Sequence, residues 1–362
     1  MNTLHLYLQN LDHNYRQIRK KIQPNTLCIG VVKANAYGTE FIHFAKRLVE
    51  LGVDTLAVAY TEEGVQLRKE GIKIPIMVFY PQKNSLEALI ESNLEPCLYS
   101  KHLLLSFEIL LNEKKIENYP IHIKYNTGLN RVGFPFDEVN WILDKISLPC
   151  FNLKTVYSHL AASEEKRPSL LCDKQIQRFK KIKEQHSKKN EAPPKFHLLN
   201  SSGIFNYPEL QFDAVRCGIA FHGFANHPDW DKLLKPVAQL ETIITQIHDV
   251  MKGESVGYDH GWKAPKQVRI ASLPLGHADG IGRHFGNQSS SVIIHGQEAP
   301  IVGNVCMDML MVDVSEISCE EGDKVNLFRP LRSASEFAVN GGSISYEVLA
   351  GLGSRIKRVI HF

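Results

Sequence analysis

Lys33 lies in the segment VVKANAYG, where an apolar run passes into a turn that contains glycine. A partly desolvated lysine has a lowered pKa, and the neutral amine that results can form a Schiff base with a carbonyl compound. A lysine that merely snorkels out of a strand end is the structural alternative. Asn35 and Tyr37 add polar groups at the same place, so we favour a chemical role for Lys33.

Two further polar side chains follow apolar runs later in the chain. Arg131 comes after the turn-forming stretch NTGLN, and a guanidinium there can clamp a carboxylate through two hydrogen bonds. His159 ends the run TVYSH. An exposed loop arginine and a structural histidine are the alternatives for these two residues.

Two adjacent segments, HLLNSSG and VRCGIAFHG, predict a phosphate site. Asn200 and Ser201 open a short predicted helix, while Gly218 and Ile219 can offer backbone N–H groups, which bind phosphate well at helix N-termini. Arg216 lies on the strand before them and can point inward. An amine-bearing lysine, a phosphate cradle and an inward arginine together indicate pyridoxal phosphate as cofactor.

A barrel would place all these residues at one mouth. The first two-thirds of the chain alternate between short apolar runs and amphipathic stretches, such as the helical pattern over residues 41–49. Eight apolar strands separated by helices predict a (β/α)8 barrel, an α/β fold whose active site lies at the C-terminal ends of its strands. The expected strands are residues 26–32, 54–60, 75–79, 94–99, 121–125, 153–159, 196–200 and 212–218.

The pattern changes near residue 235, where helical periodicity fades and strand-like runs separated by Gly and Asp begin. We therefore expect a barrel domain over residues 1–234 and a C-terminal all-β domain over residues 235–362. The expected strands of this second domain fall within residues 239–250, 267–276, 290–296, 299–305, 309–314 and 323–328.

Bulk properties exclude several classes of protein. A net charge of +3 over 362 residues is too small to indicate a nucleic-acid partner. The seven cysteines are odd in number and form no C-x-x-C pair, which favours free thiols in a reducing compartment. No apolar run is long enough for a membrane span, and no signal peptide is evident, so we expect a cytoplasmic protein. The scattered histidines form no metal motif, and the Gly-rich GIGRHFG at Gly280 lies outside any Rossmann context.

The motifs taken together resemble those of the alanine racemases. VVKANAYG is similar to that family's pyridoxal-phosphate attachment motif, and KYNTGLNRVGF, YSHLAASE, LNSSG, VRCGIAFHG, ESVGYD, LGHADG, GNVCMDMLMVDV and SYEVL follow in the family's order. The resemblance runs from about residue 26 to the C-terminus. It implies that Lys33 carries the cofactor and acts as one base, while Tyr258 acts from the opposite face and comes from the partner subunit of a homodimer.

The resemblance also implies a role for each remaining site residue. Arg216 faces the pyridine nitrogen, and His159 packs on the cofactor ring and links Tyr258 to Arg216. Arg131 and the backbone N–H of Met307 hold the substrate carboxylate, with the partner subunit again implied for Met307 and Asp308, which share one loop. The other matches are Tyr37, Ser201, Gly218, Ile219 and Tyr346 at the phosphate, Asn200 as a support, Asp308 beside Met307, Arg358 as a partner of Tyr258, and Lys124 as a possible carbamate site.

The sequence departs from the family pattern at a few positions. Asn126 replaces the usual Asp, Leu129 and Asn130 replace Met and Gly, and His277 and His222 replace Tyr. None of these changes removes a catalytic group, but Asn126 and His277 leave the preference for alanine open.

The family implies interconversion of L-alanine and D-alanine for peptidoglycan. A racemase of broader range and a non-catalytic barrel that binds pyridoxal phosphate are the alternatives. A decarboxylase on a similar barrel is disfavoured, because such enzymes wrap β segments around both ends of the barrel and carry a Gly-rich phosphate loop, and neither feature is evident here.

Overall fold

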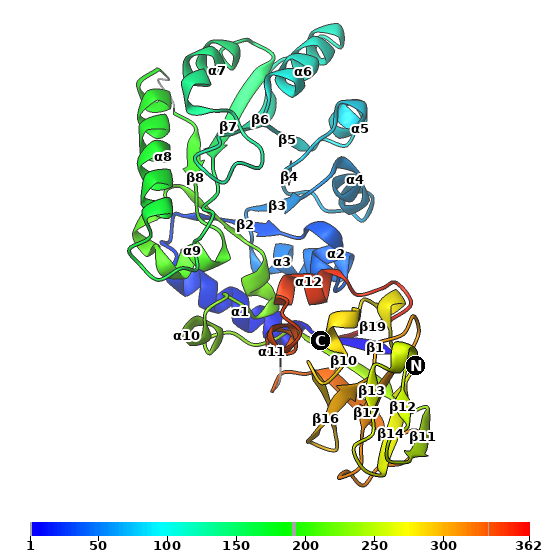
Figure 1. Cartoon of the computed structure of the whole chain (residues 1–362). Helices are drawn as coiled ribbons and strands as arrows, with labels where there is room; N and C mark the ends of the chain where they lie inside the picture. The colour runs from blue at the N-terminus through cyan, green and yellow to red at the C-terminus, as the bar shows by residue number, and fades with distance from the viewer. Residues whose placement is uncertain (1, 190–192, 332) are drawn as a thin grey trace.

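The computed structural model describes residues 2–189, 193–331 and 333–362. Its first part is a closed barrel of eight parallel strands in sequence order, in which the last strand pairs with the first (Figure 1). All eight expected strands are confirmed. They are β2 (Leu27–Val31), β3 (Thr55–Val58), β4 (Ile76–Val78), β5 (Glu95–Leu98), β6 (Tyr119–Lys124), β7 (Phe151–Tyr157), β8 (Lys195–His197) and β9 (Ala214–Cys217).

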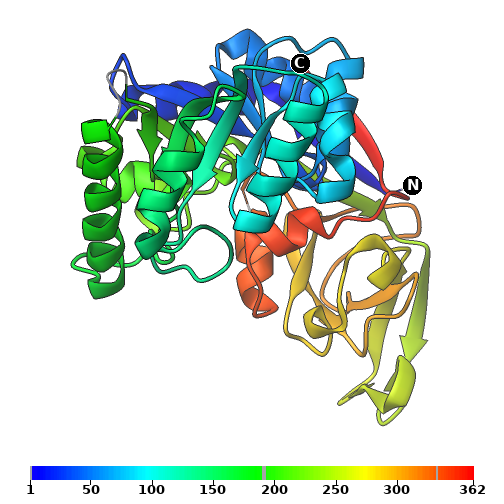
Figure 2. The ribbon, with the colours of Figure 1, turned by 90° about the horizontal axis from the view of Figure 1, so that it is seen from above.

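Helices surround the barrel (Figure 2), and the longer ones bury an apolar stripe in the core. In α6 (Lys101–Glu113), Leu103, Leu104, Phe107 and Leu111 form that stripe at helical spacing, and the Ser100 hydroxyl caps the first turn by accepting a hydrogen bond from Leu103 N. The other long connections contain α1 (Leu8–Lys21), α3 (Phe41–Leu51), α4 (Thr61–Lys69), α5 (Leu86–Glu91), α7 (Val139–Lys145), α8 (Leu170–Lys189) and α9 (Ser201–Asn206).

The second part is built on a nine-stranded sheet in the order β11-β14-β17-β16-β15-β18-β10-β1-β19. Two short helices, α11 (Ala334–Asn340) and α12 (Ser345–Ala350), interrupt its strands and lie between the sheet and the barrel (Figure 1). The strands are β1 (Thr3–Tyr7), β10 (Ala238–Ile243), β11 (Gln246–Val250), β14 (Val268–Leu273), β15 (Ser291–Ile294), β16 (Gln297–Val302), β17 (Leu310–Asp313), β18 (Lys324–Phe328) and β19 (Lys357–His361).

The first strand of the chain lies in this second sheet, which the sequence analysis did not predict. β1 pairs antiparallel with β10 and parallel with β19, so both ends of the chain meet beside the β domain. The supposed absence of a β segment before the barrel therefore no longer weighs against a decarboxylase. No helix among the described residues has the length and apolar character that crossing a bilayer requires.

Candidate active site

A cavity of about 590 Å³ opens at the C-terminal ends of the barrel strands. Barrel enzymes place their active sites at this mouth. Every site residue that the sequence analysis assigned to the barrel lines the cavity, and Tyr346 reaches it from α12. The barrel residues are Lys33, Tyr37, Lys124, Arg131, His159, Asn200, Ser201, Arg216, Gly218 and Ile219.

Lys33 begins a strained turn that directly follows β2. Residues 34–37 have φ values of 54°, 54°, 48° and 57°, so four consecutive non-glycine residues are left-handed. Each such residue costs about 1–2 kcal/mol. Strain of this kind persists only where surrounding contacts impose it, and it is concentrated at functional sites.

Three contacts from distant elements hold this turn. The Glu63 carboxylate, at the start of α4, accepts a hydrogen bond from the backbone N–H of Ala34 at 2.6 Å. The Arg358 guanidinium donates to the carbonyl oxygen of Gly38 at 3.0 Å. α12 packs so closely that a Cβ at Gly38 would lie 2.0 Å from the Leu349 carbonyl oxygen. The second domain therefore helps to position Lys33.

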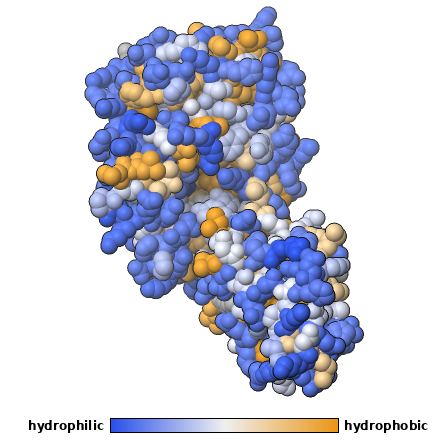
Figure 3. All heavy atoms as spheres, viewed as in Figure 1, coloured by the Kyte–Doolittle hydropathy of each residue, from blue (hydrophilic) through white to orange (hydrophobic). Residues whose placement is uncertain are grey.

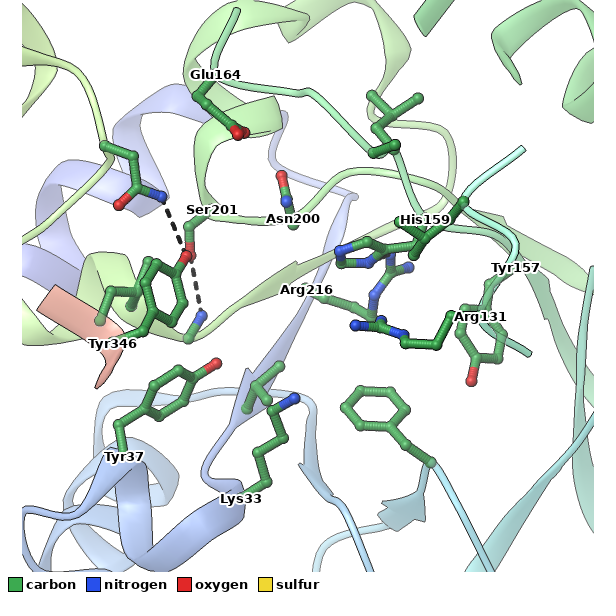
Figure 4. A pocket seen from close by; sticks show the side chains of 18 of the residues that line it. Lys33, Tyr37, Arg131, Tyr157, His159, Glu164, Asn200, Ser201, Arg216 and Tyr346 are labelled. Carbon is green, nitrogen blue, oxygen red and sulfur yellow. Dashed lines mark hydrogen bonds between the residues drawn. The ribbon is translucent and has the colours of Figure 1, made fainter. Parts of the chain in front are cut away.

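The Lys33 amine is directed toward Arg131 and Arg216 across the cavity (Figure 4). Burial, reinforced by the positive charge of Arg131, lowers the pKa of Lys33, and Glu63 opposes this only in part. The neutral amine, which is the nucleophilic and basic form, is therefore more populated than for a lysine in water.

Hydroxyl and backbone N–H groups gather on the Tyr346 side of the cavity (Figure 4). The Ser201 hydroxyl accepts a hydrogen bond from Gly218 N at 3.1 Å, and the Tyr346 hydroxyl accepts one from Asn226 at 3.1 Å. A Cβ at Gly218 would lie 2.0 Å from the Tyr37 hydroxyl, so only glycine permits this approach. These groups form a cradle that fits a phosphate.

Two short helices begin at this cradle. Asn200 caps α9 by accepting a hydrogen bond from Gly203 N at 2.9 Å. The 3₁₀ helix η4 (Ile219–His222) starts at Ile219, where backbone N–H donors but no helix were expected from the sequence. Free N–H groups at such helix starts favour an anion. The donor set therefore fits the phosphate of pyridoxal phosphate.

Arg216 lies deeper in the barrel mouth, where its terminal nitrogens are held by several acceptors. One donates to His197 Nδ1 at 2.5 Å, and the other to the carbonyl oxygens of Ser158 and Leu198 at 2.8 and 2.9 Å. His159 Nδ1 lies 3.2 Å from that second nitrogen. Burial lowers the pKa of Arg216 to about 10, so the guanidinium stays charged at neutral pH.

The two histidines beside Arg216 are neutral. Burial and the charge of Arg216 hold the pKa values of both His159 and His197 well below the usual range for imidazole. A neutral imidazole has one accepting nitrogen, and in each of these residues Nδ1 faces the guanidinium.

Lys124 lines the cavity, and its side-chain nitrogen lies over two aromatic rings. Its ammonium is 5.4 Å from the Tyr80 ring centre and 5.9 Å from that of Tyr157. Burial, with the nearby charges of Arg131 and Arg216, lowers the pKa of Lys124 to about 7. The side chain therefore titrates near neutral pH.

Tyr258, Met307 and Asp308 do not join the cavity of their own chain. Strands β12 (Ser255–Val256) and β13 (Trp262–Lys263) form a two-stranded hairpin, and Tyr258 lies in the turn that connects them. Tyr258 is 70% exposed and Met307 is 65% exposed. Asp308 accepts a hydrogen bond from Arg355 at 2.6 Å. The resemblance implied that these residues act in the partner's site, and their exposure is compatible with that role.

Arg358 contacts the Lys33 turn and its own neighbourhood. Besides Gly38, its guanidinium donates to the carbonyl oxygens of Thr39, Leu352, Gly353 and Ile356. Its expected partnership with Tyr258 is not among these contacts and stays a prediction.

Some residues of the site were missed from sequence. Tyr80 lies two residues after the end of β4 and lines the cavity, so the rule that selected polar residues after each strand could have found it. Glu63, His197 and Asn226 act through contacts that no local pattern reveals.

Asn126 closes its loop by accepting hydrogen bonds from Gly128 N and Asn130 N.

Known proteins match the chain along almost its whole length. The alanine racemase N-terminal domain family matches residues 6–226, and the alanine racemase C-terminal domain family matches residues 237–360. Alanine racemase 1 of Clostridium acetobutylicum is 35% identical, over 97% of this chain and 93% of its own length.

Solved structures agree in fold. An alanine racemase from D-cycloserine-producing Streptomyces lavendulae has a TM-score of 0.94 at 25% identity, covering 100% of this chain and 97% of that one. An alanine racemase from Bartonella henselae with covalently bound pyridoxal phosphate has a TM-score of 0.89 at 28% identity, covering 99% of each chain. With both domain families matched and the predicted barrel residues gathered around one cavity, the chain belongs to the alanine racemase family.

Proposed function

We propose that this protein binds pyridoxal phosphate at Lys33 and interconverts L-alanine and D-alanine. The observation that carries the proposal is the placement of a desolvated lysine amine between a phosphate cradle and a buried arginine. The covalently bound pyridoxal phosphate in the Bartonella henselae relative supports the same cofactor.

Different residues of the cavity would hold different parts of the cofactor. Tyr37, Ser201, Tyr346 and the backbone of Gly218 and Ile219 would hold its phosphate, with Asn200 supporting them. Arg216 would face the pyridine nitrogen through Nε–H, the donor that its other contacts do not use. His159 would pack on the ring. When bound, pyridoxal phosphate is an electron sink that acidifies the α-proton of an attached amino acid.

Proton transfer needs one base on each face of the α-carbon. Lys33 Nζ accepts or returns the α-proton on one face, since its lowered pKa makes the neutral amine available. The partner's Tyr258 acts on the opposite face. Two bases on opposite faces exchange the hydrogen with inversion, and this is what distinguishes a racemase from an enzyme that restores the same configuration.

Arg216 restrains side reactions. A guanidinium does not readily give up a proton, so a ring nitrogen bound opposite Arg216 would stay unprotonated. A weaker electron sink favours return of the proton to the α-carbon over transamination.

The substrate carboxylate would bind Arg131, together with the backbone N–H of the partner's Met307. Lys124 lies close enough to Arg131 for their charges to interact, and this raises the proportion of its neutral amine. That amine can take up CO2 as a carbamate, and the resulting anion would orient the Arg131 guanidinium.

The assembly that we propose is a homodimer with shared sites. Apolar residues come to the surface where the barrel meets the β domain (Figure 3). Ile344 lines the cavity yet is 60% exposed, and Met307 is similarly uncovered. A partner subunit that covers these side chains would also close the cavity to water. The physiological role that we propose, from the family, is cytoplasmic supply of D-alanine for peptidoglycan.

The first experiment incubates the purified protein with L-alanine in deuterated water and follows α-proton exchange and D-alanine together. We expect deuterium at the α-carbon and an equal final mixture of both enantiomers. Exchange without D-alanine would retain Lys33 as a base and contradict the role of Tyr258. Exchange with L-serine but not with alanine would mean that the protein is a racemase with a different substrate range.

A further inference from the structure

A row of polar side chains crosses the inside of the barrel beneath the active site. It takes one residue from each of five consecutive strands, β9 to β5. Adjacent members sit on neighbouring strands, and Thr155 lies directly opposite His122 in the β6–β7 register. The row consists of Arg216, His197, Thr155, His122 and Glu95.

Hydrogen bonds join every adjacent pair of the row. Arg216 lies 2.5 Å from His197 Nδ1, and His197 Nε2 lies 2.9 Å from the Thr155 hydroxyl. That hydroxyl lies 2.8 Å from His122 Nδ1, and His122 Nε2 lies 2.9 Å from the Glu95 carboxylate. The row therefore forms a continuous path from the active site to the start of β5.

The chemistry of the two ends sets the direction of every bond. Arg216 can only donate, so His197 Nδ1 must accept and Nε2 must carry the ring proton. The Thr155 hydroxyl then accepts from His197 and donates its single proton to His122 Nδ1. His122 consequently carries its proton on Nε2 and donates it to Glu95. With both histidines neutral, one arrangement of protons satisfies all four bonds.

Such a row is unusual inside a barrel, where branched apolar side chains dominate. His122, Thr155, His197 and Arg216 are buried, and only Glu95 keeps a little exposure, at 14% of its side chain. Buried polar groups destabilise a fold unless they are fully hydrogen-bonded. Apolar residues would fill the same space without the free-energy cost of burying polar groups. The row is therefore better explained by an effect on Arg216 than by packing.

Glu95 is suited to end the row as an anion. Burial alone would raise its pKa, but the hydrogen bond from His122 and the nearby charges of Lys154 and Arg68 bring that pKa below its ordinary value. A carboxylate at one end and a guanidinium at the other polarise the bonds between them in the same direction.

We propose that Glu95, His122 and Thr155 are positioning residues that act on Arg216 through His197. They fix the His197 tautomer whose Nδ1 accepts from Arg216, and this holds the guanidinium charged and in place. The consequence for catalysis rests on the proposed function, in which Arg216 faces the pyridine nitrogen. The tautomer itself does not depend on that function.

The first test compares Thr155→Val, which removes the hydroxyl at constant shape, with Thr155→Ser, which keeps it. Nitrogen-15 NMR of ring-labelled histidine in the protein without cofactor reports the tautomer directly, and His197→Asn assigns the signal. We expect the Nε2–H tautomer of His197 in the wild type and in Thr155→Ser. In Thr155→Val we expect a mixture of tautomers, because Nε2–H loses its acceptor and the bond from Arg216 is then the only one of the two that favours this tautomer. An unchanged His197 signal in Thr155→Val would overturn the proposal.

The second test measures the loaded enzyme. We expect Thr155→Val to lower kcat about tenfold, equivalent to ~1.4 kcal/mol, with little change in KM. It should also shift the absorbance of the bound cofactor and raise the ratio of transamination to racemisation, while Thr155→Ser restores all three. A fall in activity with that ratio and the spectrum unchanged would mean a merely structural role.

Glu95→Leu provides a second route if Thr155→Val does not fold. Its substitution lies at the partly exposed end of the row, and it removes the acceptor of His122 Nε2–H. The same changes in the His197 signal are expected, and Glu95→Gln, which keeps an accepting oxygen, should show smaller ones. A correct tautomer without racemase activity would contradict the proposed function alone, whereas racemase activity with an insensitive tautomer would contradict the row alone.

Discussion

Lys33 and Arg216 are both basic side chains in one cavity, but burial affects their chemistry differently. Burial lowers the pKa of Lys33 below its ordinary value, so a larger share of its amine is neutral than in a lysine exposed to water. Arg216 is lowered only to about 10 and remains a cation. The same environment thus produces a base at one position and a fixed charge at the other.

At this scale the first prediction concerns Lys33→Ala. Without the amine, the cofactor has no covalent attachment, so we expect loss of the visible absorbance of lysine-bound pyridoxal phosphate and of racemase activity by more than about a thousandfold. Ultraviolet–visible spectroscopy of the purified holoenzyme measures the first. Tyr258→Phe is the matched control, because Tyr258 lies outside this cavity and its variant should keep the spectrum while losing activity.

The second prediction concerns the pH dependence of carbamate formation at Lys124. Its pKa of about 7 means that the neutral amine, the only form that adds CO2, is populated above neutral pH and lost below it. With carbon-13 bicarbonate we expect a carbamate signal at about pH 8 that disappears at about pH 6. The signal should be absent from Lys124→Ala and present in Lys33→Ala. A signal that follows Lys33 instead would contradict this assignment.

At the scale of elements, the barrel strands could be predicted because each is a short apolar run bounded by turn residues, and these local patterns suffice. β1 could not be predicted in the same way. Its alternating Leu4 and Leu6 run directly into α1, and its partners β10 and β19 lie more than two hundred residues away. The pairing is set by tertiary contacts that one sequence does not reveal.

The left-handed turn after Lys33 could not be predicted from the sequence either. The sequence ANAY contains one residue type, Asn, that tolerates this conformation well, so no local preference explains four such residues in a row. Contacts from α4, α12 and β19 impose it. The position of Lys33 was predictable from its motif, but the means of holding it was not.

Gly38→Ala tests whether α12 supports this turn. Gly38 has a φ of +79°, and an added Cβ would clash with backbone of α12. We expect a loss of at least about 3 kcal/mol in the free energy of unfolding, measured with urea, and weaker cofactor binding. Gly71→Ala is the control, since Gly71 has a φ of +84° with open space around it and should cost only about 1–2 kcal/mol. Equal losses would show that φ alone matters.

At the scale of the whole molecule, the cavity contains one of the two proposed bases, while the other stands exposed on the β domain. A two-fold dimer resolves this division, because each subunit can then offer Tyr258 to its partner and receive one in return. Lys33→Ala and Tyr258→Phe should therefore complement each other. In a heterodimer, the cavity that retains Lys33 meets an intact Tyr258. We expect such heterodimers, co-expressed with two affinity tags and purified through both, to have about half of wild-type activity.

The control pairs Lys33→Ala with Arg216→Glu. Both changes lie in the barrel cavity, so each site of that heterodimer keeps one defect, and no activity should return. If Tyr258 acted within its own chain, the first heterodimer would also hold two defective sites and stay inactive. Racemase activity that returns in the first heterodimer but not in the second is therefore expected only if the sites are shared between subunits. If both heterodimers are inactive, the second base is a residue of the same chain.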